Sequence, residues 1–407
     1  MNRLVLWRRI GAVAIAGLLV AGAVACGKSD SGGGSGPIKI GASIPLTGQF
    51  SQEGKAAKQG YQVWEAMVNE KGGLLGRKVE LVIKDDASNQ NTIVSDYNAL
   101  ISQDNVDLLL GTFSSLLNLP ASSVAEKNRM LYVEPAGGSP DMFNRGYKYL
   151  FFAQQATADK QGLVFADWVK NLPADQRPKT AAYPTLDDPF AAPNVDGIRQ
   201  VLEGAGIKTV YKTTYAIDTK NYDSIVAAMK SANPDLVVHG ATFEDGVGLT
   251  RAMLKSGWTP KMFYETSTPS FADQYSKAVG EENTEGVMYA VSYSPEADTP
   301  GNKEFVAQYK KMFGTDIPPE DAADAYAAAQ VMQAAVEAVG SIDDQLALAD
   351  WLRDNSVDTI LGQLSWDDTG APQSDFLIGQ WQNGTAEVVL PPDVATADPE
   401  VGWHPGS

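Results

Sequence analysis

The clearest candidate for binding chemistry is the stretch from Asp107 to Ser115, where the apolar run Leu108 to Leu110 leads into Gly111 and then into hydroxyl residues. The run is typical of a buried strand, and a helical pattern follows the serines. After a strand of an α/β sheet, the first turn of a helix presents unpaired N–H groups and the positive end of its dipole. This corner is predicted to hold a small anion such as a carboxylate. Ser114 and Ser115 also suit a helix N-cap, and both interpretations can hold together.

Catalytic chemistry is poorly supported by the residue types present. The chain has two histidines, His239 and His404, so a Ser–His–acid device would depend on His239. No Gly-x-Ser-x-Gly, His-Glu-x-x-His or Gly-x-x-x-x-Gly-Lys motif occurs. The paired acids at Asp85-Asp86, Asp187-Asp188 and Asp367-Asp368 lack the spacing of a calcium loop and are expected in solvated turns. We therefore predict no enzyme activity, no metal site and no cofactor.

Composition and charge narrow the possible partners. The 407 residues are 44% hydrophobic, which is ordinary for globular proteins and sufficient for two or three domains. The formal net charge is −18, and the first 25 residues contribute three arginines and no acid. A surface this acidic argues against binding to nucleic acid and against electrostatic adhesion to anionic lipid.

The first 37 residues have the pattern of an export signal followed by a tether. Three arginines precede the apolar run Ile10 to Ala25, which is too short and too rich in glycine for a membrane span. The run ends at Cys26, the single cysteine, and the small residues before it resemble a bacterial lipobox. We predict a signal peptide over residues 1–25, lipidation of Cys26 and a flexible tether over 26–37. Ordinary cleavage at an Ala-x-Ala-like site is the alternative, and the pair Arg8-Arg9 leaves the choice between Sec and twin-arginine export open.

From Ile38 onward, apolar runs with strand character alternate with segments of helical periodicity. The alternation restarts after Phe152, which predicts an α/β protein with two doubly wound parallel sheets. Asn383-Gly384 predicts a tight hairpin turn near the end. Residues 391–407 have no periodicity and are expected to be loose. The strands are expected at 38–44, 79–83, 106–110, 130–133, 180–183, 210–215, 236–238, 261–264, 287–291, 376–382 and 385–390.

Several short motifs, taken in order, resemble those of the leucine/isoleucine/valine-binding proteins. These are type I periplasmic binding proteins, the extracytoplasmic receptors of ABC importers. The similarity runs from about Ile38 to Glu387. The motifs are Pro45-Leu46-Thr47-Gly48, Lys71-Gly72-Gly73 with Gly76-Arg77, Asp85-Asp86-Ala87, Gly111 to Ser115, Glu134-Pro135-Ala136, Asn355 to Thr359 and Trp366-Asp367.

The resemblance implies two lobes joined by three crossover strands, near Phe152, Tyr289 and Thr359. The first lobe would comprise residues 38–152 plus 290–359, and the second 153–289 plus 360–390. A ligand would bind between the lobes, and hinge closure would present a new surface to a permease.

In the first lobe, the resemblance implies that one corner holds a ligand carboxylate and an adjacent segment holds its amino group. Ser115 matches the family's serine, and Ser114 and Phe113 lie beside it. The carbonyl of Ala136 would accept from an ammonium. Gly137 and Gly138 follow it, and Gly138 stands where relatives have a hydroxyl residue, which weakens the case for an amino acid; a glycine pair chosen only for turn geometry is the alternative.

In the second lobe, the matching positions are an aromatic residue, a strand-end loop and an acid that meets the ammonium. Phe190 would supply a ring face without a hydroxyl. Glu265 is the better partner for a cation, although a solvated acid is an equal alternative. Glu53, from the first lobe, matches an aromatic residue that contacts the ligand side chain in relatives. The remaining second-lobe candidates, whose register is uncertain by one residue, are Thr242, Phe243 and Thr266.

These implications predict a monomeric receptor on the outer face of the cell membrane, held by lipid on Cys26 and working with ABC permease subunits. A branched-chain or other amino acid is the leading ligand. A sensor of the same fold for an amide or an aromatic acid, coupled to a signalling partner, is the alternative.

Overall fold

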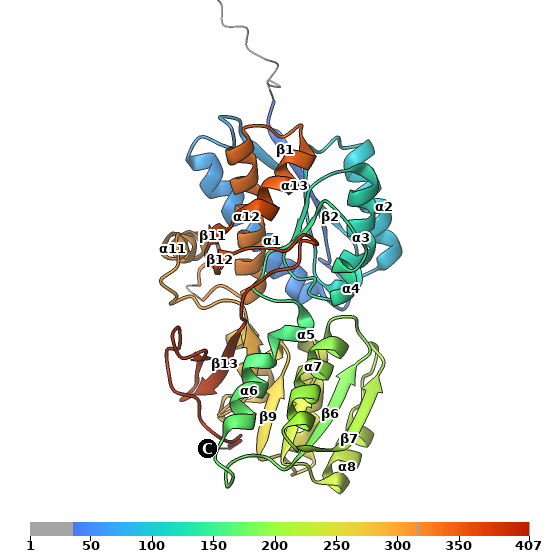
Figure 1. The fold of residues 1–407 in the computed structure, drawn as a ribbon, viewed down its shortest axis with the longest axis vertical. Coiled ribbons are helices and arrows are strands. Elements are labelled where there is room, and N and C mark those ends of the chain that lie inside the picture. Colours follow the sequence, from blue (N-terminus) through green and yellow to red (C-terminus); the bar gives the residue numbers. More distant parts are fainter. Residues whose placement is uncertain (1–35, 316, 407) are drawn as a thin grey trace, which may run out of the picture. The chain divides into compact units, whose positions relative to one another are not determined.

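The computed structural model describes residues 36–315 and 317–406; the predicted signal peptide, Cys26 and most of the tether lie outside them. The described chain is built around two main sheets (Figure 1). The first has the strand order β2-β1-β3-β4-β5 and is entirely parallel. The second has the order β14-β13-β10-β9-β8-β6-β7, with β13 and β14 antiparallel to their neighbours. The predicted fold class is therefore confirmed.

Lobe 1 is the part of the chain that packs on the first sheet. Its sheet strands are β1 (Ile38–Ile44), β2 (Val79–Asp85), β3 (Leu108–Leu110), β4 (Tyr132–Glu134) and β5 (Leu150–Phe152). A separate hairpin joins β11 (Val357–Thr359) to β12 (Gly362–Leu364). The helices are α1 (Ser51–Glu70), α2 (Gln90–Ser102), α3 (Ser115–Asn128), α4 (Pro140–Phe143), α11 (Asn302–Phe313), α12 (Glu320–Val339) and α13 (Gln345–Asp354).

Lobe 2 packs on the second sheet. Its strands are β6 (Thr180–Leu186), β7 (Lys208–Tyr215), β8 (Leu236–His239), β9 (Met262–Glu265), β10 (Met288–Val291), β13 (Leu377–Gln382) and β14 (Thr385–Leu390). Its helices are α5 (Ala158–Gln161), α6 (Leu163–Asn171), α7 (Ala191–Gly204), α8 (Asp223–Ala232), α9 (Phe243–Lys255) and α10 (Ala272–Val279), with short 3₁₀ turns η1 (Thr268–Phe271) and η2 (Glu281–Asn283). The predicted Asn383-Gly384 turn joins β13 to β14, and both residues have positive φ.

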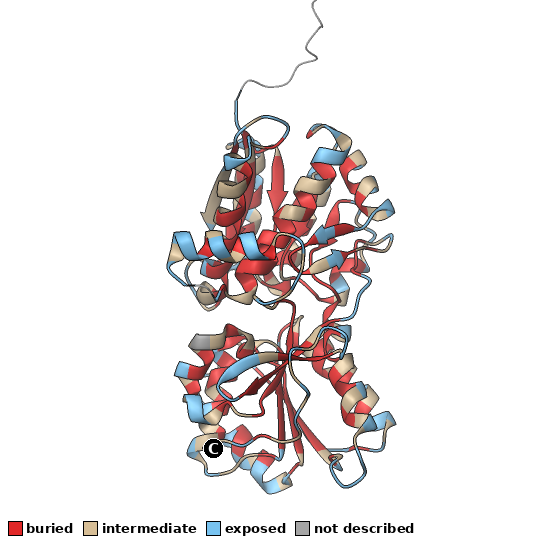
Figure 2. Ribbon diagram, turned by 90° about the vertical axis from the view of Figure 1, so that its left-hand side faces the viewer, coloured by how far each residue is buried: buried red, intermediate tan, exposed pale blue. Residues whose placement is uncertain are grey.

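Continuous apolar runs form the central strands because helices cover both faces of each sheet (Figure 2). In β3, Leu108 and Leu110 face one core while Leu109 faces another. In β8, Val237 and its neighbour Val238 divide in the same way between two cores. Among the described residues, no helix combines the length and apolar character needed to cross a membrane.

The passages between the lobes partly follow the expected positions. The chain leaves lobe 1 after β5 and leaves lobe 2 after β10. The third passage comes later than Thr359, because the β11–β12 hairpin and Trp366 remain on lobe 1. Trp366 is buried in the lobe 1 core, and its Nε1 donates to the carbonyl of Phe152 at 2.6 Å. Phe376 is the first residue after it that belongs to a lobe 2 core.

The segment 391–407, expected to be loose, packs on lobe 2 up to its last described residue, 406. It has no helix or strand, but Trp403 is buried against Phe263, with ring centroids 4.8 Å apart. The Nε1 of Trp403 donates to the carbonyl of Asn283 at 2.8 Å. The side chain of Gln380 also bonds the backbone of Glu400. One tryptophan and buried amides hold a segment whose sequence shows no periodicity.

Candidate functional site

The strand-to-helix corner predicted to hold an anion is formed between β3 and α3. The strand order of lobe 1 reverses between β1 and β3, which is where ligands bind in doubly wound sheets. Gly111 follows β3 at a point where a Cβ would lie 2.3 Å from the Cβ of Glu134, so only glycine fits. Ser114 is the N-cap of α3, and its carbonyl accepts from the N–H of Asn118 at 2.8 Å. The first N–H groups of α3 are left for a ligand.

A buried hydrogen-bond network fixes this corner from below. The side chain of Asn118 donates to the carbonyl of Thr112 at 2.7 Å and accepts from the N–H of the same residue at 3.1 Å. Its amide also donates to Glu134 Oε2 at 3.2 Å. Tyr132 donates its hydroxyl to Asn118 Oδ1 at 2.6 Å. These hydrogen bonds hold the loop between β3 and α3, although Glu134 Oε1 is buried without a partner in the described structure.

Ser114 and Ser115 have different environments. The hydroxyl of Ser115 accepts from the N–H of Ser139 at 3.0 Å and is fully buried. The hydroxyl of Ser114 is buried and has no hydrogen-bond partner in the described structure, and Ser114 lines the cavity between the lobes. Of the two serines, Ser114 lines the cavity, whereas the hydroxyl of Ser115 holds the loop that carries Gly138.

A small cavity opens at this corner between the two lobes. It encloses about 50 Å³ of space that the centre of a water molecule can reach. Six predicted residues line it: Phe113, Ser114, Ala136, Gly138, Phe190 and Thr266. Nine further residues complete the lining: Phe152, Gln154, Gln161, Ser267, Ala290, Glu320, Asp321, Asp324 and Phe376.

The glycine at position 138 has a steric reason. A Cβ there would lie 3.1 Å from the N–H nitrogen of Ala158 and 3.2 Å from the ring of Phe152. The carbonyl of Gly138 accepts from Ala158 N–H at 2.6 Å, which ties this loop to the start of α5. A side chain at this position would therefore be in tight contact with Phe152 and with the start of α5.

Glu265, predicted to meet an ammonium, is directed elsewhere. Its Oε1 lies 2.9 Å from Nδ1 of His239, the residue opposite it on β8. The Nε2 of His239 lies 2.7 Å from the hydroxyl of Tyr215. All three are buried in lobe 2, and none lines the cavity. Glu265 Oε1 thus bonds to His239 within lobe 2, while its Oε2 is buried without a partner in the described structure.

The other predicted residues do not line the cavity and make contacts elsewhere. Thr242 donates to Asp245 Oδ2 at 3.0 Å, and Phe243 stacks near Phe271 with centroids 4.9 Å apart. Gly137 lies over the carboxylate of Glu134. Glu53 is buried and accepts from the N–H of Phe243, so a lobe 1 side chain contacts the start of α9 in lobe 2.

The first turns of α12 supply three acids that sequence reasoning missed. Asp324 accepts from Ser292 at 2.5 Å and from Gln154 Nε2 at 2.6 Å. Asp321 is buried and makes no side-chain hydrogen bond within the described structure, and Glu320 accepts from Ser292 N–H. Their place at a helix N-terminus favours negative charge. The run Glu320-Asp321 directly after two prolines was a helix-start signal that could have drawn attention to them.

Burial governs the electrostatics of these acids. Desolvation raises the pKa of Asp321 and Asp324 well above the ordinary range, and the pKa of Glu320 is raised for the same reason. No Lys, Arg or His lines the cavity among the described residues. A cationic group in the cavity would favour the ionised form of these acids, while Ser114 and the start of α3 suit an anionic oxygen. The described residues include no cluster of His, Cys, Asp and Glu suited to a metal ion.

The chain is similar to known binding proteins in sequence and in fold. The Leu/Ile/Val-binding protein homolog 3 of Brucella melitensis is 27% identical over 351 residues, which cover 85% of this chain and 92% of that protein. A leucine-binding protein from Thermotoga maritima superposes with a TM-score of 0.78 at 22% identity, covering 88% of this chain and 99% of that one. A solute-binding protein from R. palustris in complex with benzoate superposes with a TM-score of 0.76 at 18% identity, covering 91% and 99%.

The family model described as periplasmic binding protein matches residues 37–386, the whole of both sheets except the end of β14. Its members are ligand-binding proteins rather than enzymes. This chain belongs to the periplasmic binding protein family.

Proposed function

We propose that this protein is the extracytoplasmic solute-binding receptor of an ABC importer and that it delivers a small amino acid to a membrane permease. The similarity to proteins named for binding leucine, isoleucine and valine supports this proposal. Lipidation of Cys26, which lies outside the described residues, would hold the receptor at the outer face of the membrane. We further propose that it works as a monomer.

The proposal of an amino acid as the ligand rests on the positions of two side chains in the cavity. The unpartnered hydroxyl of Ser114 and the carboxyl of Asp321, which makes no hydrogen bond among the described residues, line the same cavity, and Ser114 lies at a helix N-terminus. A zwitterion satisfies both, because its carboxylate suits Ser114 and the start of α3 while its ammonium suits Asp321. The carbonyl of Ala136 provides a second acceptor for the ammonium.

The rest of the lining suits an apolar side chain. Phe113, Phe190 and Phe376 contribute rings from both lobes. The small cavity volume suits a compact ligand enclosed by both lobes. A ligand that contacts both lobes binds the closed state more tightly than the open state. Binding would therefore shift the population towards the closed state.

An aromatic acid is the second candidate. The phenylalanine rings and the benzoate complex of the R. palustris protein favour it. An aromatic acid has no cationic group, so Asp321, Asp324 and Glu320 would stay neutral and Asp321 would gain no charge-assisted hydrogen bond from the ligand. An amino acid therefore remains the better match.

Thermal-shift measurements on the purified protein test the proposal with amino acids, their amides and aromatic acids. An amino acid present at a hundred times its dissociation constant should add about 2.7 kcal/mol to the free energy of unfolding. The corresponding amide and a benzoate should stabilise the protein much less. If benzoate alone stabilises the protein, the ligand is an aromatic acid and not an amino acid. If neither class stabilises it, both proposed ligands are wrong.

A further inference from the structure

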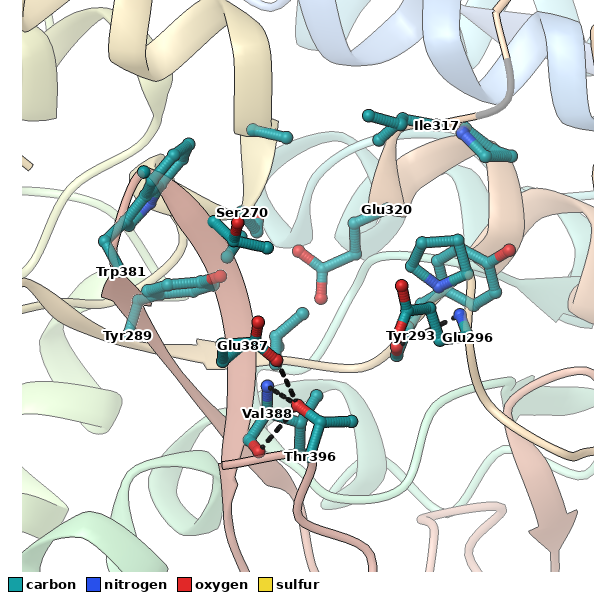
Figure 3. A pocket seen from close by; sticks show the side chains of 18 residues that line it. Ser270, Tyr289, Tyr293, Glu296, Ile317, Glu320, Trp381, Glu387, Val388 and Thr396 are labelled. Carbon is teal, nitrogen blue, oxygen red and sulfur yellow. Dashed lines mark hydrogen bonds between the residues drawn. The ribbon is translucent and has the colours of Figure 1, made fainter. Parts of the chain in front are cut away.

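A second cavity lies on the other face of β10 from the ligand cleft (Figure 3). Ala290 lines the cleft, whereas its neighbours Tyr289 and Val291 line this cavity. The centre of a water molecule can reach about 250 Å³ of this cavity, which is five times the volume that it can reach in the ligand cleft. That volume admits a small organic molecule.

The walls of the second cavity combine carboxylates with aromatic rings. Glu320, Glu387 and Glu296 line it, and no Lys, Arg or His does so among the described residues. Tyr289 and Trp381 provide ring surface. Carboxylates next to aromatic faces are the combination that recognises an organic ammonium, through charge-assisted hydrogen bonds and cation–π contact.

The hydroxyl of Tyr289 is a further polar group of this cavity. Tyr289 is 2% exposed, and none of the hydrogen bonds found among the described residues involves its hydroxyl. Figure 3 shows the hydroxyl directed into the cavity, towards Ser270 and Glu387. A hydroxyl directed into a cavity can donate to or accept from a polar group of a bound molecule.

The cavity is bounded by both lobes. Glu320 begins α12 in lobe 1, whereas Tyr289, Trp381 and Glu387 lie on strands β10, β13 and β14 of lobe 2. Glu320 also lines the ligand cleft, so one carboxylate borders both spaces. A molecule bound here contacts the hinge region in the lobe arrangement of this structure.

We propose that this second cavity is a binding site for a small organic cation, an ammonium group carried on an apolar or aromatic body. The ammonium lies between Glu387 and Glu320, and the body packs on Tyr289 and Trp381. This site is separate from the amino-acid cleft and does not depend on the ligand proposed there.

The probe is phenethylammonium chloride, and its matched control is 3-phenylpropionate, which has a similar body and the opposite charge. Calorimetric titration should show saturable binding of the amine and none of the acid. Glu387→Gln should weaken amine binding by about tenfold, since it removes the charge from a charge-assisted hydrogen bond. Glu281→Gln removes the same charge from an exposed position in η2 and should change nothing.

Two more variants distinguish loss of amine binding at this site from changes in the cleft and from loss of folding. Tyr289→Phe keeps the ring and removes only the hydroxyl, and it should weaken amine binding while the thermal midpoint is retained. Ser114→Ala alters the cleft and should leave amine affinity unchanged. The proposal is overturned if the amine does not bind, if 3-phenylpropionate binds equally, or if Ser114→Ala weakens the amine while Glu387→Gln does not.

Discussion

The two sides of the ligand cleft are built in different ways. At the β3–α3 corner, backbone N–H groups, a helix N-terminus and a single serine hydroxyl face the cavity. At the start of α12, carboxylate side chains face it instead. The first side depends on where a strand ends and a helix begins, and the second on which way individual side chains point. Because the β3–α3 corner is built from backbone, substitutions that add atoms there must move the chain. The acids of α12 are side chains, so they can be replaced without moving the backbone.

The largest effect should come from Gly111→Ala. The added Cβ would lie 2.3 Å from the Cβ and 2.6 Å from the Cα of Glu134, so backbone must move to admit it. We expect the free energy of unfolding to fall by about 3 kcal/mol, measured by urea denaturation. Gly204→Ala is the control, since nothing lies within 4 Å of a Cβ there, and it should stay within about 0.5 kcal/mol of the parent protein. Equal effects would show that the corner is not tightly packed.

The next effect concerns Glu53, the lobe 1 acid that contacts α9 of lobe 2. Burial raises the pKa of Glu53 to about 7, against the opposing effect of the Phe243 N–H, and the nearby charges of Glu244 and Asp245 raise it further. Asp321 also faces it. The folded state therefore favours the neutral carboxyl, whose ordinary pKa is 4.5. Its contribution to stability is complete below pH 4.5 and is lost as the pH rises to about 7.

Glu53→Gln should remove this part of the pH dependence. At pH 8 the variant should be more stable than the parent by up to about 3 kcal/mol, and near pH 4 the two should coincide. Denaturation curves across this pH range provide the measurement. Parallel curves with a constant offset would mean that Glu53 does not titrate in this window.

These cases show what the sequence could and could not predict. The corner was predictable because an apolar run, Gly111 and a helix start define it locally. The choice between Ser114 and Ser115 was not, because it depends on which hydroxyl Ser139 occupies. Glu265 was assigned to the ligand, but its cross-strand partner His239 was 26 residues away and its pairing depends on register.

The acids of α12 were missed for a related reason. They begin an alanine-rich helix that was expected only to pack in the core, and nothing local shows that its first turn reaches the cleft. The hydrogen bond from Gln154 to Asp324 shows that this first turn reaches the cleft, and its two residues are 170 positions apart in the sequence. Long-range side-chain contacts of this kind are outside the reach of periodicity and motif spacing.

Asp321→Asn tests the side of the cleft that carries charge. Replacing the carboxylate with an amide removes the partner of the ligand ammonium, and we expect amino-acid affinity to fall about thirtyfold, or about 2 kcal/mol. Folding stability should not fall, since burial already disfavours the charged form. Asp343→Asn, at an exposed position before α13, is the matched control. Calorimetry showing parental affinity for the Asp321 variant would remove this residue from the site.

The smallest effects, and the sharpest comparison, come from two adjacent serines. Ser114→Ala removes a hydroxyl that faces the cavity without a partner, so affinity should fall about fivefold while stability is unchanged. Ser115→Ala leaves the N–H of Ser139 unpaired, so stability should fall by about 1 kcal/mol while affinity is retained. Measuring both quantities for both variants gives a crossed pattern that general disruption of the corner would not produce. The reverse pattern would return the ligand contact to Ser115 and show that the first turn of α3 rearranges when ligand binds.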